Sequence, residues 1–387
     1  MYNFVTHLEN KRVCLLDTTL VLLAAGNSSR FRLPVKKQWL RIDHDPLWHF
    51  VTEKLFSSEK FAKVIITAHA DEVTFMHNYT NHLVIAGGQT RQESLSKALD
   101  HVNTPYVLIS DIARACVDME LLNNIIENRH QADCIVPYLS VSDTVVYNNE
   151  TINRDNIKRI QTPQLSKVAV LKKALSSNET FTDESSAIVA SGGSRYFVKG
   201  SQDADKITHI SDLNKLPCLA APASTTFVGN GFDVHAFEAN SVMMLGGIEI
   251  DSVDYGFKAH SDGDVAIHAL IDALLGAAGL GDIGMLFPDS DASFQNIDSK
   301  ILLTACVKQL HHLGYEVMNA DLTIAAEAPR LSAYKDAMRS TLAPLLHIPK
   351  ARMNIKATTT EKLGFIGRKE GVGVMASATL NYFDWTK

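Results

Sequence analysis

The stretch TLVLLAAGNSSRFRLPVKKQWL, residues 19–40, joins a short apolar run to a loop of small and basic residues. Runs of the same kind recur later in the first half, at 63–68, 106–110 and 133–137. Amphipathic helical patterns such as 91–99 and 121–127 lie between them. Short strands that can be buried on both faces, alternating with helices, predict an α/β layer fold around a largely parallel sheet. The first half is therefore a candidate nucleotide-binding domain.

The segment PCLAAPASTT, residues 217–226, interrupts this periodicity with two prolines and a cluster of small residues. Beyond it, helical patterns near 262–277 and over 299–313 accompany an alternating strand at 372–383. A sheet with one covered face and helices packed on it indicates an α+β domain. The predicted organisation is a leader (1–17), a first domain (18–213), a linker (214–226) and a second domain (227–387).

The composition narrows the class of protein. The 387 residues carry a formal net charge of −6, which argues against a nucleic-acid surface or a polybasic membrane anchor. Five scattered cysteines without a CxxC spacing predict neither a disulfide framework nor a thiolate zinc site. The amino terminus lacks the apolar core of a signal peptide, and no stretch approaches the roughly 20 apolar residues of a membrane span. We therefore expect a cytoplasmic protein with no membrane partner.

The motif GFDVHAFE, residues 231–238, suggests a metal site. Asp233 and His235 are two residues apart, so on a strand their side chains point to the same face. His268, on the helix predicted near 262–277, is the natural third ligand. One carboxylate and two imidazoles with a vacant position favour Zn²⁺, with Mn²⁺ or Co²⁺ as alternatives.

The helix that carries His268 has its own expected details. Ser261 or Asp262 would cap its amino terminus. Asp264 and Asp272 lie four residues to either side of His268, and either one could orient the imidazole ring.

Three motifs of the second half resemble 2-C-methyl-D-erythritol 2,4-cyclodiphosphate synthase, over almost all of residues 227–384. They are GFDVHAF, AHSDGDVAIHALIDALLGAAGLGDIG and IKATTTEKLGF. The resemblance implies a homotrimer with active sites between subunits, zinc on Asp233, His235 and His268, and Mg²⁺ on Glu361. It further implies that a substrate phosphate attacks the β-phosphorus of its own cytidine diphosphate and expels CMP, chemistry that needs positioning and charge neutralisation.

The same resemblance assigns the remaining synthase residues. His260 and Ser261 would contact the substrate phosphate, and Thr359 would stabilise the transition state. The methylerythritol pocket would be lined by Asp282, Ile283, Gly284, Phe287, Asp289 and Asp291. The cytidine phosphate would be surrounded by Ala326, Pro329, Arg330, Leu331, Thr358, Phe365 and Arg368.

The loop AAGNSSRFRLPVKKQWL, residues 24–40, offers free backbone N–H groups and basic side chains for a triphosphate. It is neither a GxGxxG fingerprint nor a GxxxxGK[ST] loop, which disfavours hydride transfer and ordinary ATPase chemistry. The segments GGQTRQES (87–94) and SDIARA (110–115) follow at other predicted strand ends. Together these segments resemble 2-C-methyl-D-erythritol 4-phosphate cytidylyltransferase, over roughly residues 18–213.

This second resemblance implies roles in binding and catalysis. Arg30 and Lys37 would stabilise the transition state at the α-phosphorus of CTP, and Asp111 would hold Mg²⁺. Arg154 and Lys206 would grip the methylerythritol phosphate. The nucleotide would be bound by backbone groups or side chains of Ala24, Ala25, Gly26, Gly88, Gln89 and Ser94.

The first half departs from the pattern of its family at several places, one of which is Trp39, where a Tyr is usual. The usual H-D-A-A-R-P segment is here Ser110 to Ala115, which keeps Asp111 and Arg114 but loses the flanking His and Pro. Lys36 precedes Lys37 where Pro is frequent, so either lysine is a candidate for the catalytic one. An alternative is therefore that only the second half is active and the first half is a scaffold.

Together the two resemblances predict a bifunctional enzyme of isoprenoid-precursor synthesis, acting on CTP and methylerythritol phosphates, with the intervening kinase as a separate partner. A dimeric first half and a trimeric second half predict an assembly of six chains or a multiple. A competing interpretation makes the second half a zinc hydrolase, because a metal with an open position can activate water.

Overall fold

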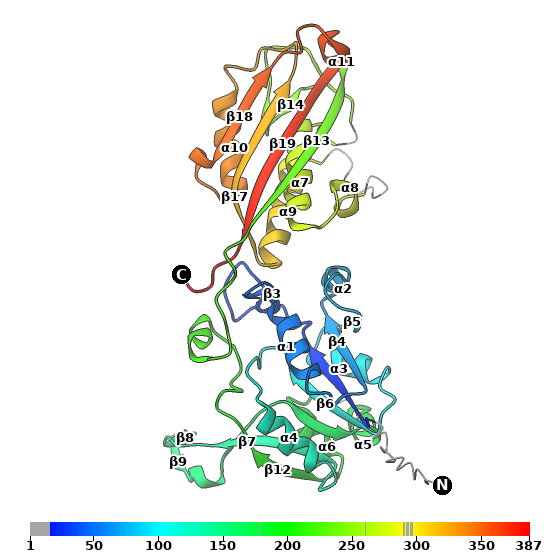
Figure 1. Cartoon of the computed structure of the whole chain (residues 1–387), viewed down its shortest axis with the longest axis vertical. Helices are drawn as coiled ribbons and strands as arrows, with labels where there is room; N and C mark the ends of the chain where they lie inside the picture. Colours follow the sequence, from blue (N-terminus) through cyan, green and yellow to red (C-terminus); the bar gives the residue numbers. More distant parts are fainter. Residues whose placement is uncertain (1–15, 178, 260, 289–290, 292–293, 295–296) are drawn as a thin grey trace, which may run out of the picture. The chain divides into compact units, whose positions relative to one another are not determined.

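The computed structural model describes residues 16–177, 179–259, 261–288, 291, 294 and 297–387. The chain forms two compact units. The first comprises the described residues up to Arg30 together with Leu47–Leu219, and the second comprises Phe31–Pro46 together with Ala220–Lys387. Each unit has its own sheet, shown in Figure 1.

The first unit is built on an eight-stranded sheet. Its strands run in the order β10-β7-β11-β6-β1-β4-β5, and β12 pairs with β7. They are β1 (Thr18–Leu23), β4 (Lys63–Ala68), β5 (Leu83–Ala86), β6 (Tyr106–Asp111), β7 (Cys134–Ser140), β10 (Lys158–Ile160), β11 (Gln164–Lys167) and β12 (Arg195–Lys199).

Strand β1 lies at the centre of the parallel part of this sheet. It pairs in parallel with β4 on one side and with β6 on the other, and all six of its residues are buried. The α/β fold with a mainly parallel sheet is therefore confirmed. Antiparallel pairing is confined to the side of the sheet where β11 joins β6 and β7, and β10 joins β7.

Several helices of the first unit begin at polar capping residues. In α3 (Arg91–Leu99) the Thr90 side chain accepts a hydrogen bond from the Glu93 N–H, and in α4 (Met119–Glu127) Asp118 accepts one from Leu121 N–H. The other helices are α1 (Leu47–Phe56), α2 (Val73–His77), α5 (Val168–Leu175) and α6 (Glu184–Ala190). A short hairpin of β8 (Val145–Tyr147) and β9 (Glu150–Ile152) stands off this body.

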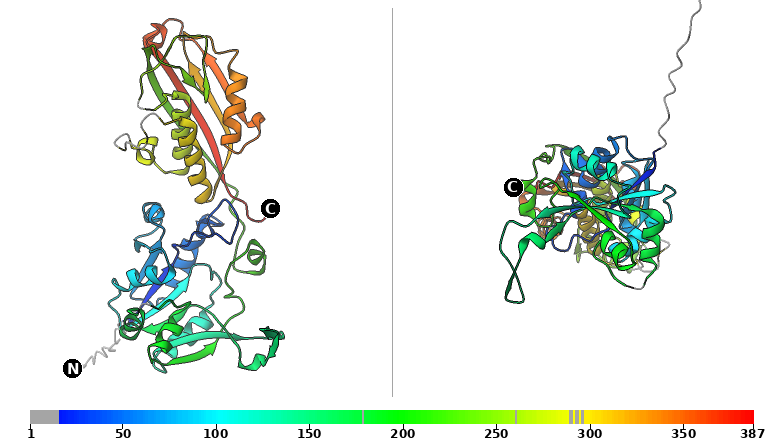
Figure 2. Two further views of the ribbon diagram at one scale, coloured as in Figure 1. Left: turned by 180° about the vertical axis from the view of Figure 1, so that it is seen from behind. Right: turned by 90° about the horizontal axis from the view of Figure 1, so that it is seen from below.

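The second unit contains a five-stranded sheet in the order β16-β13-β19-β17-β18. The strands are β13 (Thr226–Ala239), β16 (Tyr255–Phe257), β17 (Tyr315–Ala325), β18 (Met353–Thr358) and β19 (Gly371–Tyr382). Helices α7 (Val265–Ala278) and α9 (Ser299–His312) cover one face, as Figures 1 and 2 show. The unit also holds α8 (Ile283–Leu286), α10 (Lys335–Leu345), α11 (Gly364–Gly367), and the β14 (Met244–Leu245) and β15 (Ile248–Glu249) pair.

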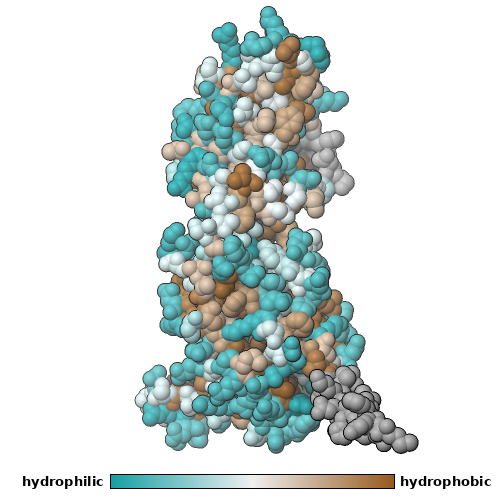
Figure 3. Space-filling view, viewed as in Figure 1, coloured by the Kyte–Doolittle hydropathy of each residue, from teal (hydrophilic) through white to brown (hydrophobic). Residues whose placement is uncertain are grey.

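One face of this sheet is buried and the other is open, as the alternating pattern predicts. On β19, Val372, Val374 and Ala376 are buried, whereas Met375 is 62% exposed. On β13, Phe232 is likewise 63% exposed. The displayed face of the molecule mixes hydrophilic with apolar residues (Figure 3), in keeping with the mild net charge. No helix among the described residues is long and apolar enough to span a membrane.

Segment Phe31–Pro46 packs within the second unit although it interrupts the first along the chain. It contains a short turn at Lys37–Trp39 (η1) and the paired strands β2 (Arg41–Ile42) and β3 (Asp45–Pro46). The sequence treated 18–213 as one continuous domain. Within the second unit, the Asp43 N–H donates to the Ala221 carbonyl, the Lys36 N–H to the His312 carbonyl and Arg41 Nη2 to the Leu313 carbonyl.

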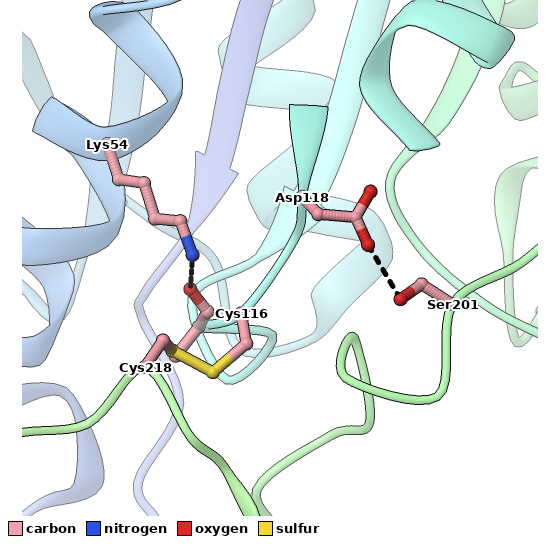
Figure 4. The surroundings of a disulfide bond; sticks show 6 residues. Lys54, Cys116, Asp118, Ser201 and Cys218 are labelled. Carbon is pink, nitrogen blue, oxygen red and sulfur yellow. Dashed lines mark hydrogen bonds between the residues drawn. A yellow bond between two sulfur atoms is a disulfide. The ribbon is translucent and has the colours of Figure 1, made fainter. Parts of the chain in front are cut away.

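Cys116 and Cys218 form a disulfide, with their Cα atoms 5.7 Å apart (Figure 4). The expectation that the cysteines make no disulfide was wrong for this pair. The two residues are 102 positions apart, and only the fold brings them together. Lys54 donates a hydrogen bond to the Ala115 carbonyl beside this disulfide. Cys134 and Cys306 are free and buried.

We expect Gly231→Ala to destabilise the second unit by about 3 kcal/mol, because a Cβ there would lie 2.0 Å from the Ala269 carbonyl oxygen of α7. The free energy of unfolding in urea measures this effect. Gly276→Ala is the matched control, since its Cβ would meet only the Asn230 oxygen at 3.9 Å. The control should be neutral or slightly stabilising, by about 0.5–1 kcal/mol. Equal stability of the two variants would contradict the close helix–strand contact.

Candidate active sites

The close contact between β13 and α7 also forms the predicted metal cluster. Gly229 and Gly231 lack side chains on the face of β13 that meets α7. Because side chains alternate along a strand, Asp233 and His235 point to that same face. His268 comes from α7. One ligand atom from each of Asp233, His235 and His268 lies within 4.8 Å of the others.

The distances within the cluster suit a shared cation. Asp233 Oδ2 lies 3.3 Å from His235 Nδ1 and 3.4 Å from His268 Nδ1. His235 Nδ1 is buried, and no described residue forms a hydrogen bond with it. Burial lowers the pKa of His235, although the Asp233 carboxylate opposes this shift. A neutral imidazole with an unshared nitrogen beside a carboxylate is a donor set that fits a divalent metal.

Serine hydroxyls orient the His268 ring. His268 Nε2 lies 3.0 Å from Ser299 Oγ and 3.2 Å from Ser261 Oγ. Ser299 Oγ donates to Asp262 Oδ1 at 2.5 Å, and the Ser299 N–H donates to the other oxygen of the same carboxylate. These bonds leave His268 Nδ1 facing Asp233. The sequence did not predict the role of Ser299, which lies 31 residues from His268 at the start of another helix.

Two expectations about this helix were wrong. Asp264, not Ser261 or Asp262, caps α7 by accepting hydrogen bonds from the Ala266 and Ile267 N–H groups. Asp264 also accepts from Gly246 and Gly247 N–H, so its fully buried carboxylate is used for folding. Asp272 accepts from the Ile283 N–H. Neither Asp264 nor Asp272 therefore hydrogen-bonds the His268 ring.

The hydroxyl-rich loop follows directly after β18, which ends at Thr358. Thr359 Oγ1 donates to Glu361 Oε1 at 3.0 Å. Glu327 Oε1 accepts hydrogen bonds from the Thr360 and Lys362 N–H groups and thereby holds the loop. Thr359 and Glu361 thus share one exposed loop, and Glu361 is not part of the Asp233, His235 and His268 cluster.

The remaining synthase residues occupy several short elements. Asp282 caps α8 by accepting from the Met285 N–H, and this helix contains Ile283 and Gly284. Phe287 follows α8. Ala326 lies beside the hydroxyl-rich loop, since its N–H donates to the Thr358 carbonyl. Arg368 forms an ion pair with Glu370. Phe365 lies in α11, and Pro329, Arg330, Leu331 and Asp291 lie in loops. His260 and Asp289 lie outside the described residues.

In the first unit, two loops at strand ends meet. A Cβ at Gly87 would lie 2.6 Å from the Ala25 Cβ and 2.8 Å from Ser94 Oγ, so the loop after β1 packs on the loop after β5. Ser94 Oγ accepts from the Gly88 N–H, and Glu93 accepts from the Gln89 N–H. The structure therefore brings Ala25, Gly88 and Ser94 together at the carboxyl ends of the parallel strands, where α/β proteins bind ligands.

Asp111 lies at the end of the neighbouring strand β6 between two cations. Arg91 Nε lies 3.1 Å from its Oδ1, and Lys206 Nζ lies 2.6 Å from its Oδ2. Burial would raise the pKa of Asp111, but these two charges outweigh it and hold the pKa at about 2. Arg91 also pairs with Glu184 at 2.6 Å. The sequence reasoning assigned no individual role to Arg91 or Glu184, although Arg91 lies in the motif GGQTRQES.

The other basic residues of the quoted motifs contact different groups. Arg30 is exposed at the end of the loop after β1, in the first unit, which also contains Ala24 and Gly26. Lys37 belongs to the second unit and lies 5.5 Å above the Phe31 ring. Arg154 is exposed near the β8–β9 hairpin and donates to the Ser142 carbonyl. Arg114 is buried and donates to Thr162 Oγ1 and the Ala204 carbonyl, so its contacts are structural.

Comparison with known proteins identifies the family of each half of the chain. Residues 18–218 match the 2-C-methyl-D-erythritol 4-phosphate cytidylyltransferase family, and residues 226–381 match the YgbB family. The bifunctional enzyme IspD/IspF of Sulfurimonas denitrificans is 59% identical over the full length of both chains. That of Campylobacter jejuni is 49% identical, over 96% of this chain and 99% of the relative. The solved structure of the bifunctional IspDF from Campylobacter jejuni aligns with a TM-score of 0.89, covering 96% of this chain and all of that one.

The two units thus define a bifunctional enzyme in which a nucleotidyltransferase and a phosphorus–oxygen lyase share one chain. The chain belongs to the bifunctional IspD/IspF family. It carries cytidylyltransferase and cyclodiphosphate synthase activities of the methylerythritol phosphate route to isoprenoids. Nothing favours the alternative of an inactive first half. Metal dependence is general to both families.

We expect His235→Ala to abolish stable metal binding in the second unit, because it removes one of three protein ligands. Ser299→Ala should weaken metal binding about 10–100-fold, because it removes a hydrogen bond that orients His268. Metal content after dialysis against graded zinc concentrations, measured by mass spectrometry, tests both variants. His101→Ala, at an exposed histidine of the first unit, is the control. Wild-type zinc content in His235→Ala would contradict the assignment.

We expect Asp111→Asn to destabilise the first unit by about 2 kcal/mol above pH 5, because the folded-state pKa of about 2 lies below the unfolded value of about 3.9. This contribution is present above the unfolded pKa and is lost as the pH falls toward 2. Urea unfolding of both proteins from pH 3 to 7 tests the prediction. Asp205→Asn, which removes an exposed ion pair with Arg159, should change little. A difference that is independent of pH would show that the Asp111 carboxylate is not the stabilising charge.

Proposed function

We propose that Asp233, His235 and His268 hold Zn²⁺, with Mn²⁺ or Co²⁺ as alternatives, in the synthase site. The observation that carries this proposal is the convergence of three ligand atoms within 4.8 Å. The metal would supply Lewis acidity and a fixed positive charge beside the diphosphate. The chain's own contribution is to lower the pKa of His235 by burial and to orient the His268 ring toward Asp233 through the hydroxyls of Ser261 and Ser299.

The hydroxyl-rich loop would receive the other end of the diphosphate. Glu361 would hold Mg²⁺, Thr359 would donate a hydrogen bond to the developing charge on phosphorus, and His260 and Ser261 would contact the attacking phosphate. Thr359 already directs its hydroxyl to Glu361 at 3.0 Å, which supports a shared role. The cytidine phosphate would lie among Ala326, Pro329, Arg330, Leu331, Thr358, Phe365 and Arg368. The methylerythritol would lie against Asp282, Ile283, Gly284, Phe287, Asp289 and Asp291.

In the transferase site, the loop of Ala24, Ala25 and Gly26 would bind the CTP phosphates through backbone N–H groups. Arg30 and Lys37 would stabilise charge at the α-phosphorus as pyrophosphate leaves. Gly88, Gln89 and Ser94 would face the cytosine or the ribose. Their loop packs on the loop of Ala25, which supports a single nucleotide site.

Asp111 would bind Mg²⁺ in this site. Lys206 already occupies one of its carboxylate oxygens at 2.6 Å. A bound Mg²⁺ would supply positive charge beside the triphosphate, and Lys206, with Arg154, would bind the methylerythritol phosphate. Arg91 and Lys206 keep the buried Asp111 carboxylate paired, which avoids the cost of an unpaired buried charge.

The assembly would combine dimer contacts of the first unit with trimer contacts of the second, giving six chains or a multiple. Two observations support a synthase site shared between copies. Glu361 lies outside the metal cluster of its own chain. Val228, Phe232, Val234 and Met375 expose an apolar surface on the uncovered face of the sheet.

We further propose functional boundaries at 18–213 and 227–387 with a linker at 214–226, a cytoplasmic location, and a functional link with the intervening kinase.

Phosphorus NMR of the purified protein with Mg²⁺ and Zn²⁺ tests both assigned reactions. CTP with methylerythritol 4-phosphate should yield pyrophosphate, and the doubly phosphorylated cytidine intermediate should yield CMP and a cyclic diphosphate. Lys37→Ala should slow only the first reaction and His235→Ala only the second, by about 10²-fold or more. Release of orthophosphate in place of a cyclic product would indicate a hydrolase. Loss of both reactions in either variant would contradict the separate assignments.

A further inference from the structure

The turn that carries Lys37 is anchored on the carboxyl end of α9. The Lys36 N–H donates to the His312 carbonyl at 3.2 Å. Three residues further on, the Trp39 carbonyl oxygen packs so closely on Gly314 that a Cβ there would lie 2.5 Å from it. Gly314 has φ +85°, a conformation that favours glycine. The corner His312–Gly314 therefore contacts the turn on both sides of Lys37.

Arg41 fixes the same turn from its other end. The whole Arg41 residue is only 1% exposed, and its Nη2 donates a hydrogen bond to the Leu313 carbonyl at 3.3 Å. The guanidinium carbon lies 4.6 Å from the Tyr382 ring centroid and 5.2 Å from that of Tyr315. The two aromatic rings and the main-chain carbonyl together restrict the orientation of the buried Arg41 guanidinium.

The carboxyl-terminal residues close over this arrangement. Phe383 N–H donates to the Gly314 carbonyl at 2.9 Å. Trp385 is 7% exposed, and its indole Nε1–H donates to the Arg41 carbonyl at 2.7 Å. The carboxyl-terminal tail, the corner His312–Gly314 and the turn that carries Lys37 are thus joined by hydrogen bonds at Lys36, Arg41 and Gly314. All of these residues belong to the second unit.

We propose that the carboxyl-terminal tail, through Trp385 and Arg41, positions Lys37 for the cytidylyltransferase reaction. The inference rests on the proposed role of Lys37 at the α-phosphorus. A lysine that acts on transition-state charge is sensitive to small displacements, and a shift of about 1 Å can cost about 10²-fold in rate. Trp385 and Arg41 are therefore positioning residues that act through Lys37.

The first experiment compares Trp385→Ala, Trp385→Phe and the tail control Lys387→Ala in the full chain. Trp385→Ala should lower the transferase kcat about 10–100-fold with little change in KM for CTP, because the lost interaction acts in the transition state. Trp385→Phe keeps most of the packing and should lose about 3–10-fold, the share of one hydrogen bond. Lys387→Ala, at an exposed residue paired with Asp384, should match the wild type. Synthase activity, measured on the same samples, should stay within about twofold of the wild type because the metal cluster is unaltered.

A double-mutant cycle with Lys37→Ala separates positioning from general stabilisation. If Trp385 acts through Lys37, Trp385→Ala should cause little further loss in the Lys37→Ala background. Additive losses, or an equal fall of both activities, would overturn the proposal. If Trp385→Ala fails to fold, the single variants Trp385→Phe and Gly314→Ala replace it. Wild-type transferase activity in both of them would also overturn the proposal. A Lys37→Ala protein with normal transferase activity would instead overturn the proposed role of Lys37, which is a separate outcome.

Discussion

The direct contact of α7 with β13 is the constraint on which the second unit depends. Glycines at 229 and 231 let the helix backbone approach the strand, because any side chain there would meet the carbonyls of Ala273 or Ala269. Because side chains alternate along β13, Asp233 and His235 also point toward α7, and there they lie close to His268. One packing requirement therefore fixes both the core and the cluster of candidate metal ligands.

The first unit follows a different principle. Its ligand-type residues follow β1, β5 and β6. These strands run parallel, so their loops lie together at the carboxyl ends of the strands. The charge there is balanced within the chain, since Arg91 and Lys206 neutralise Asp111 and Arg91 also neutralises Glu184. This balanced network allows a carboxylate to stay ionised although it is buried.

Local pattern predicted much of this molecule and failed at identifiable places. The strands near 19–24, 63–68 and 106–110, and the helices at 91–99 and 299–313, agree with the structure because alternation and capping are local properties. Asp264 was misjudged as an orienting group, because its true partners, Gly246 and Gly247, lie on a distant hairpin. Ser299 was missed for the same reason.

The sequence by itself determined the two-part organisation, the fold class of each part and the identity of the three metal-ligand candidates, since each depends on spacing or on motifs within short segments. Only the tertiary structure decided that Phe31–Pro46 packs with the second unit, that Cys116 pairs with Cys218, and that Arg91 shares Asp111 with Lys206. These contacts join residues far apart in the chain. Their energies depend on burial and on partners that no local pattern specifies.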